Sequence, residues 1–155
     1  MHNMLSQLDS RLNVVSVIDH PDLLELVVFL QSKFATCPVC NHQTIKRHSA
    51  YMRKIFDLPF QDKAVLFHIK SHKWFCKNDT CKRKVFTERL PWIDHYRRRT
   101  KRLEEALRTI VFSTSAVQAE HVCQSLNMPV SHDTLLRLVY STSLPRKESP
   151  FRRYR

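Results

Sequence analysis

Hydrophobic residues near the N-terminus fall in two short runs that are separated by a turn signal. Residues 14–18 are rich in β-branched side chains, and an apolar run returns over residues 23–29. Between them, residues 19–22 have the sequence Asp-His-Pro-Asp, which is typical of a turn. The pattern predicts a short β-hairpin, and a buried helix that begins at Pro21 is the alternative.

Polar and apolar positions alternate along two longer segments in the middle of the chain. Residues 51–56 and residues 64–75 both follow a period of two, which is the period of a strand. Residues 57–60, with the sequence Asp-Leu-Pro-Phe, predict a turn between these strands. The second strand leads directly into Cys76.

From Trp92 onward the apolar residues recur at spacings of three and four, which predicts helices. The apolar positions of the first helix lie within residues 103–111. A second helix fits residues 115–126, with Ser115 as the N-cap and Gln118 at the capping-box position.

Positive charge is concentrated in the later parts of the chain. The sequence has 26 Lys and Arg against 14 Asp and Glu, which gives a net charge of +12. Residues 1–36 are net negative, whereas residues 37–91 carry +8 and residues 92–155 carry +6. Such an excess suits a polyanionic partner, and a solvated basic surface is the alternative.

Two absences limit the class of protein. Glycine does not occur in the 155 residues, so Gly-rich phosphate-binding loops are excluded, and turns with positive φ must use Asn, Asp or a bound metal. The longest apolar run, residues 23–30, is interrupted by Glu25 and is too short to span a bilayer, and the N-terminus does not have the order of a signal peptide. We therefore expect a cytoplasmic protein without a membrane partner.

Four of the five cysteines form two close pairs. Two residues separate Cys37 from Cys40, four separate Cys76 from Cys81, and 35 lie between the pairs. Each pair can present two thiolates to one ion, and two pairs complete the tetrahedral four-sulfur site of structural zinc. The strands predicted in the interval return the chain, as a zinc ribbon requires. We predict one structural Zn²⁺ ion that stabilises the fold and does not catalyse.

Other roles for the cysteines are less well supported. Disulfides need an oxidising compartment, and nothing indicates secretion. A redox Cys-x2-Cys pair would need a surrounding βαβ pattern, which is missing. His42, His48 and His72 are alternative ligands, although four thiolates already complete a site. Cys123, on the predicted second helix, is expected to be a small apolar core residue.

The region after the second helix has the spacing of a helix-turn-helix. Pro129 breaks the helix, and Val130 can fill the angle between two helices. Ser131 is the expected N-cap of a third helix that ends at Leu144-Pro145. An ordinary αα-corner in a helical bundle is the alternative. The start of the third helix would present these residues to DNA: Ser131, His132, Asp133, Thr134 and Arg137.

The densest basic run is Arg97-Arg98-Arg99-Thr100-Lys101-Arg102. At the start of a helix these charges would oppose the helix dipole, so helix stability does not account for them. Contact with DNA phosphates does account for them, and a solvated helix face is the alternative. The predicted phosphate contacts are Arg97, Arg98, Arg99, Lys101 and Arg102.

These patterns together predict an α+β protein, with an N-terminal β-rich zinc ribbon followed by a three-helix helix-turn-helix module. We expect the β-rich zinc-ribbon module over residues 1–91, the helical DNA-binding module over residues 92–145 and a basic tail over residues 146–155.

Several ordered segments resemble one known family. They resemble the N-terminal region of the bacterial insertion-sequence transposases of the ISL-three type, over about residues 12–145. The resemblance implies a zinc-binding module and a helix-turn-helix that recognise the terminal inverted repeats of the element, and then an RNase H-like catalytic domain with acidic metal ligands. The segments that carry it are Cys37-Pro38-Val39-Cys40, residues 48–53, Asp57-Leu58-Pro59, Trp74-Phe75-Cys76 with Cys81, residues 86–91 and residues 129–137.

The chain is expected to lack that catalytic domain, since the six acidic residues after Trp92 do not suggest one. We therefore expect a non-enzymatic, cytoplasmic and nucleoid-associated part or remnant of a DDE-type transposase. Its expected partner is double-stranded DNA at transposon ends, with homo-oligomerisation left open. The alternative is a zinc-ribbon module for protein interaction or dimerisation, without specific DNA recognition.

Overall fold

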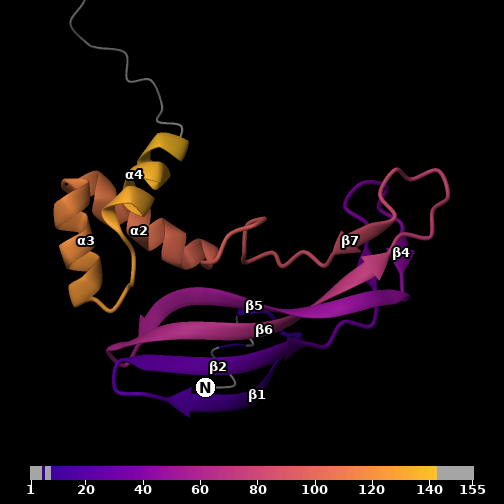
Figure 1. Cartoon of the computed structure of the whole chain (residues 1–155), viewed down its shortest axis with the longest axis horizontal. Helices are drawn as coiled ribbons and strands as arrows, with labels where there is room; N and C mark the ends of the chain where they lie inside the picture. Colours follow the sequence, from indigo (N-terminus) through magenta and orange to yellow (C-terminus); the bar gives the residue numbers. More distant parts are fainter. Residues whose placement is uncertain (1–4, 6–7, 143–155) are drawn as a thin grey trace, which may run out of the picture.

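A computed structural model describes residue 5 and residues 8–142 of the chain. From Leu12 onward the strands precede the helices along the sequence, so the α+β class with a β-rich N-terminal part is confirmed (Figure 1). None of the described helices is long and apolar enough to cross a membrane. The elements are β1 (Leu12–Asp19), β2 (Leu23–Leu30), β3 (Ala35–Thr36), β4 (Gln43–Thr44), β5 (Arg47–Phe60), β6 (Lys63–Phe75), β7 (Val85–Thr87), α2 (Lys101–Ser113), α3 (Ala116–Ser125) and α4 (His132–Ser141).

The first two strands form the predicted hairpin. β1 and β2 pair antiparallel, with Asp19 opposite Leu24 next to the turn. In β2 the alternate residues Leu24, Leu26, Val28 and Leu30 are buried, as a strand with one covered face requires. The alternative of a helix that begins at Pro21 is therefore wrong.

β5 and β6 form a long antiparallel hairpin. The turn expected at residues 57–60 is wrong, because these residues continue β5, with an irregularity in register between Asp57 and Phe60. The chain turns instead at Gln61 and Asp62, whose φ angles are +49° and +56°. Two consecutive left-handed residues match the right-handed twist of a hairpin, so the turn works without glycine.

The main sheet has the strand order β1-β2-β6-β5, and β7 pairs with the end of β6. β2 and β6 are parallel, whereas the other pairs are antiparallel. The segment after β7 packs Leu90, Trp92 and Ile93 onto the apolar face of the sheet. There the Trp92 ring meets Phe67 edge to face, with 6.2 Å between the ring centroids. This packing forms the first hydrophobic core.

The helix expected from Trp92 begins only at Lys101. Residues 92–100 are not helical because they are tied to the sheet: Phe56 N donates to Arg98 O at 2.9 Å, and Thr100 N donates to Phe56 O at 3.0 Å. Thr100 caps α2 by accepting from Leu103 N. The positive charges of residues 97–99 therefore precede the helix.

α3 begins as expected, since the Ser115 hydroxyl accepts from Gln118 N at 3.3 Å. Ser131 holds the expected N-cap position of α4, but its side chain makes no cap bond. Glu120 of α3 accepts from His132 N at 3.1 Å instead, so one helix caps the next. The end expected at residues 144–145 lies outside the described residues.

The three helices enclose a second hydrophobic core. Leu103, Leu107 and Leu135 are buried in it, and so is Cys123, which confirms the apolar role expected for that residue. Burial also raises the pKa of the Cys123 thiol. β5 contributes to this core as well, through the half-buried Phe56 beside it.

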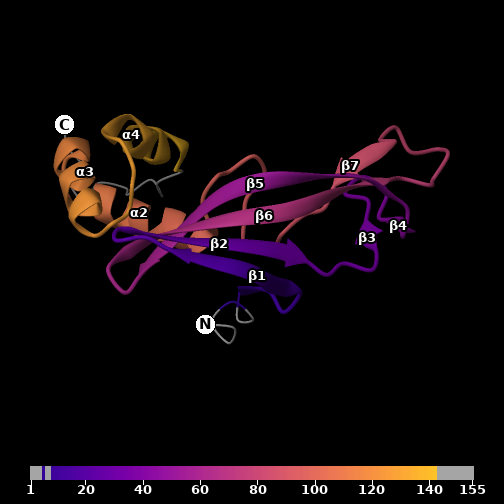
Figure 2. The ribbon, with the colours of Figure 1, turned by 60° about the horizontal axis from the view of Figure 1, so that its bottom comes forward.

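A buried carboxylate joins the sheet to the helices. Asp57 of β5 accepts from Thr100 Oγ1 at 2.6 Å and from Arg102 Nε at 2.8 Å, and Arg102 Nη2 also binds it. The helices thus lie at one end of the β5–β6 hairpin, whereas β3 and β4 lie at the other (Figure 2). The module boundary at residue 92 stays a prediction.

Candidate metal centre and nucleic-acid interface

The first cysteine pair lies in the tight turn between β3 and β4. Cys37 directly follows β3, and its N–H donates to His42 O at 2.9 Å across the hairpin. Asn41 N donates back to Cys37 O at 3.0 Å. Asn41 has φ +57°, a left-handed conformation that Asn tolerates better than most residues. The turn places the thiols of Cys37 and Cys40 on the same loop.

The second pair lies in the loop between β6 and β7. Cys76 directly follows β6, and its N–H donates to Lys84 O at 2.8 Å. Cys81 N donates to Asn78 O at 3.1 Å, while Asn78 Oδ1 accepts from Thr80 N at 3.0 Å. Asn78 therefore shapes the four-residue interval and turns Cys81 back toward Cys76.

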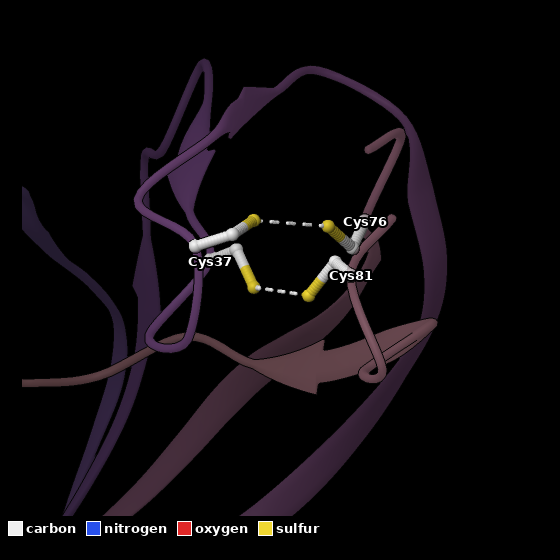
Figure 3. A group of neighbouring side chains, drawn as sticks. Cys37, Cys76 and Cys81 are labelled. Carbon is white, nitrogen blue, oxygen red and sulfur yellow. Dashed lines mark hydrogen bonds between the residues drawn. The ribbon is translucent and has the colours of Figure 1, made fainter. Parts of the chain in front are cut away.

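The two loops bring all four thiols together at the end of the β5–β6 hairpin. The Sγ atoms lie within 4.8 Å of one another, with 4.0 Å between Cys37 and Cys81 and 3.5 Å between Cys40 and Cys76 (Figure 3). Zn–S bonds of about 2.3 Å in a tetrahedron place sulfurs about 3.8 Å apart. A disulfide needs about 2.05 Å, so these distances fit one shared ion far better than two disulfides.

The thiols differ in their tendency to ionise. Burial raises the pKa of Cys37, but hydrogen bonds with the backbone of Cys40 and Val39 outweigh it and lower the pKa to about 7. At Cys76 a hydrogen bond with the Asn78 backbone lowers the pKa, but burial and the neighbouring cysteines raise it to about 12. Cys37 is thus the more easily ionised of these two thiols, and a bound cation would favour the thiolate form of all four.

Little apolar packing supports this end of the molecule. The third hydrophobic core contains Ala35, Trp74 and Phe86, and its other fully buried members are three of the cysteines themselves. Arg47 covers the Trp74 ring, with 5.4 Å from its guanidinium carbon to the centroid. Within the described residues the cluster contains cysteines alone, so the alternative ligands His42, His48 and His72 lie outside it.

The basic run does not lie on one helix face. Arg97 Nε is 3.5 Å from the buried carboxylate of Glu104. Arg99 is half-buried, and burial lowers its pKa. The guanidinium of Arg102 is held by Asp57. Three of the five predicted phosphate contacts, Arg97, Arg99 and Arg102, are therefore close to carboxylates or partly buried within the protein, which the sequence did not indicate.

The other two basic residues of the run reach solvent. Arg98 is exposed and forms no salt bridge with any described residue, although its carbonyl is bonded to β5. Lys101 is exposed and lies 3.5 Å from Asp94, which is also exposed. A surface pair of this kind contributes little and is easily replaced by a phosphate.

The residues predicted to contact DNA at the start of α4 lie close together. Ser131, His132, Asp133 and Arg137 are exposed, and Thr134 is half-buried. On the opposite side, α4 buries its leucines in the second core.

Glu120 is a residue of this surface that the sequence pattern missed. Its carboxylate binds both His132 N and His132 Nδ1, at 3.1 Å and 2.9 Å. No local signal marks it, because its partner lies on the next helix.

Comparison with known proteins gives one match. Residues 33–81 match the family described as the zinc-finger of transposase IS204/IS1001/IS1096/IS1165. No curated protein and no solved structure matches the chain. The matched segment is about a third of the sequence, and it contains both cysteine pairs and the β5–β6 hairpin between them. Residues 33–81 are therefore similar to the zinc ribbon of this transposase family, and they contain a four-cysteine cluster that could bind one zinc ion.

Proposed function

We propose that the chain is a zinc-stabilised DNA-binding part of a transposase, and that it recognises duplex DNA at the terminal repeats of a mobile element. The match of residues 33–81 to a transposase zinc ribbon is the observation that carries this proposal. The net charge of +12 supports it, because phosphate neutralisation dominates affinity for DNA. A cytoplasmic, nucleoid-associated location follows from this role.

Cys37, Cys40, Cys76 and Cys81 are the proposed zinc ligands. Four thiolates complete the coordination of zinc, so the ion holds the two loops together and leaves no position for a substrate. We propose no strand cleavage by this chain, and nuclease activity in a clean preparation would contradict that part of the proposal.

α3 and α4 are the proposed helix-turn-helix. Asn127, with φ +54°, ends α3, and Val130 packs against the helical core between the two helices. α4 would then be the recognition helix, with Thr134 and Arg137 one turn apart on it. An arginine fork can bind the O6 and N7 atoms of guanine in the major groove.

Of the five residues predicted to contact phosphates, Arg98 and Lys101 are the ones that we propose. Both are exposed next to the start of α2. Arg102 was also predicted to bind phosphate, but its guanidinium already binds Asp57, so we assign it to the fold. Arg97 lies close to Glu104, and Arg99 is half-buried, so both are weaker candidates for phosphate contact.

Selection of a preferred duplex from a random pool, followed by binding measurements in a salt series, tests this proposal. Affinity should fall steeply with salt, with a log–log slope of about 0.9 for each phosphate neutralised. Arg137→Ala should lose about 1–3 kcal/mol of preference for the selected site. Arg137→Lys retains the charge but not the fork, so it should lose the preference and keep the non-specific affinity.

Two results would contradict the proposal. If Arg137→Ala weakens binding to all DNA sequences equally, and Arg137→Lys restores the binding, then Arg137 is a phosphate contact. Weak binding that does not respond to salt would favour the alternative function, a zinc ribbon that binds a protein partner or dimerises.

A further inference from the structure

A broad groove is lined by residues of β5 and of the segment that connects β7 with α2. Its volume is about 1450 Å³, which exceeds the usual size of a small-molecule pocket. Tyr51, Arg53 and Lys73 of the β5–β6 hairpin contribute to its lining, and so do residues 83, 85–91 and 93–98.

The connecting segment is fixed at both ends of the groove. At one end β7 pairs with β6, and at the other Phe56 N donates to Arg98 O. Arg53 Nη2 also donates to Arg97 O at 3.1 Å across the groove. These contacts fix the position of the connecting segment relative to the hairpin, so the groove is preformed.

The lining is strongly basic, since it includes eight Lys and Arg residues and only two acidic residues, Glu88 and Asp94. Both acids are already bound: Glu88 is buried and hydrogen-bonded to Ser32, and Asp94 pairs with Lys101. A groove lined by one sign of charge focuses the field and attracts a polyanion. Six of its basic residues form no salt bridge with any residue from the described part of the chain: Arg53, Lys54, Lys73, Arg83, Arg89 and Arg98.

Aromatic rings accompany these charges. The side chain of Tyr96 is 88% exposed, and its backbone has φ +61°, which is strained for an aromatic residue. The neighbouring His95 ring lies 4.0 Å away, with 42° between the planes. Tyr51 lies deeper, with Lys73 Nζ 5.7 Å from its ring centroid. Apart from its contact with the His95 ring, the Tyr96 ring is open to solvent.

We propose that this groove binds single-stranded DNA. The basic side chains would bind the phosphates, and unpaired bases would stack on Tyr96 and Tyr51, which is the usual combination in proteins that bind single strands. Duplex DNA fits less well, because the faces of paired bases are already stacked on one another. The single-stranded character follows from the groove alone, whereas the choice of DNA over RNA rests on the proposed function.

The test uses the full, zinc-loaded chain and a fluorescein-labelled oligothymidine of about 15 nucleotides, the upper range of a single-strand site. Tyr96→Asn removes the ring and suits the left-handed backbone, so folding is preserved. It should weaken binding about tenfold, as expected from the loss of one stacked base. Tyr96→Phe should bind normally. Tyr140→Ala removes an equally accessible ring outside the groove, 83% exposed, and should have no effect.

Charge is tested separately. The double variant Lys73→Gln/Arg89→Gln should lower the log–log salt slope by about 0.7 for each phosphate that is no longer neutralised. Lys33→Gln removes an exposed charge outside the groove and should leave the slope unchanged.

Duplex measurements separate this inference from the proposed function. Arg137→Ala should weaken duplex binding alone, and Tyr96→Asn should weaken oligothymidine binding alone. Oligothymidine binding without duplex binding would overturn the proposed function and support the groove.

The inference is overturned if the wild type does not bind oligothymidine or if Tyr96→Asn binds it normally. Tighter binding of oligouridine would overturn the choice of DNA, and equal competition by oligoglutamate would overturn base stacking.

Discussion

Single residues at the cysteine cluster fulfil two requirements at once: they supply ligands, and they form much of the local core. Three of the cysteines are buried beside Ala35, Trp74 and Phe86. Loss of one ligand therefore removes both the metal and part of the packing. Because this end contains few other apolar residues, the metal should decide whether it folds.

Cys76→Ser should therefore abolish stoichiometric zinc binding and unfold the ribbon, because the energy of a structural zinc site is folding energy. Zinc content and the thermal melting curve are the measurements. Cys123→Ala is the matched control, since it alters a buried thiol of the helical core and should keep one zinc per chain. A zinc-free Cys76→Ser protein with an unchanged melting curve would refute the structural role.

The spacing of the cysteines was enough to predict the cluster, because the spacing within each pair is a local property and two such pairs complete a zinc site. The left-handed residues were only partly predictable. Asn41, Asp62 and Asn127 agree with the expectation that Asn and Asp replace glycine. Gln61 and Tyr96 do not, since neither residue type favours positive φ. At these two positions the surrounding fold determines the backbone.

At the scale of elements, α3 and α4 are joined by a cross-helix cap. Glu120 binds both the backbone and the ring of His132. The side-chain hydrogen bond with His132, and then the bond with its backbone, lower the pKa of Glu120 below 4.5. A carboxyl group whose pKa is lower in the folded state stabilises the protein when it is ionised.

The contribution of Glu120 should accordingly be present above about pH 4.5 and be lost as the pH falls through the lower folded value. Glu120→Gln should melt at a lower temperature than the wild type at neutral pH, and the difference should vanish in acid. Circular dichroism melts over a pH series measure this. Glu105→Gln, at an exposed position of α2, is the control. A difference that is constant with pH would exclude ionisation of Glu120 as the cause.

Element types were predictable where the apolar period was long, as in the β5–β6 hairpin and the helices. The residues at which the elements begin and end were less predictable. Residues 57–60 look like a turn because they contain Pro59, yet they remain in β5, where Asp57 binds Thr100 and Arg102. Contacts between residues more than forty positions apart determine that boundary, and no local pattern reports them.

At the scale of the whole molecule, Asp57 connects the sheet with the helices. It is buried, and its partners Thr100 and Arg102 stand at the start of α2. Its backbone neighbour Phe56 adds two hydrogen bonds to the segment that precedes α2. This junction should determine how firmly the helices are held to the end of the β5–β6 hairpin.

Asp57→Asn should destabilise the protein by about 1–3 kcal/mol, because a buried charged hydrogen-bonding group is lost while Arg102 can still reach water. Urea denaturation followed separately by tryptophan fluorescence and by circular dichroism at the helix band should give two transitions that no longer coincide. Asp62→Asn, at the exposed hairpin turn, is the control. Coincident and unshifted transitions would show that Asp57 does not couple the two cores.

The parallel pairing of β2 with β6 has a consequence for the order in which the chain assembles. About 30 residues, including the first cysteine pair and all of β5, separate the two strands. During synthesis β2 leaves the ribosome long before its partner exists, and only β1 is available to pair with it. Local hairpins form within microseconds, whereas closing a long loop onto a parallel strand is slower. The nascent chain must therefore carry the apolar side chains of β2 uncovered until β6 emerges, and this interval is when a chaperone would be of most use.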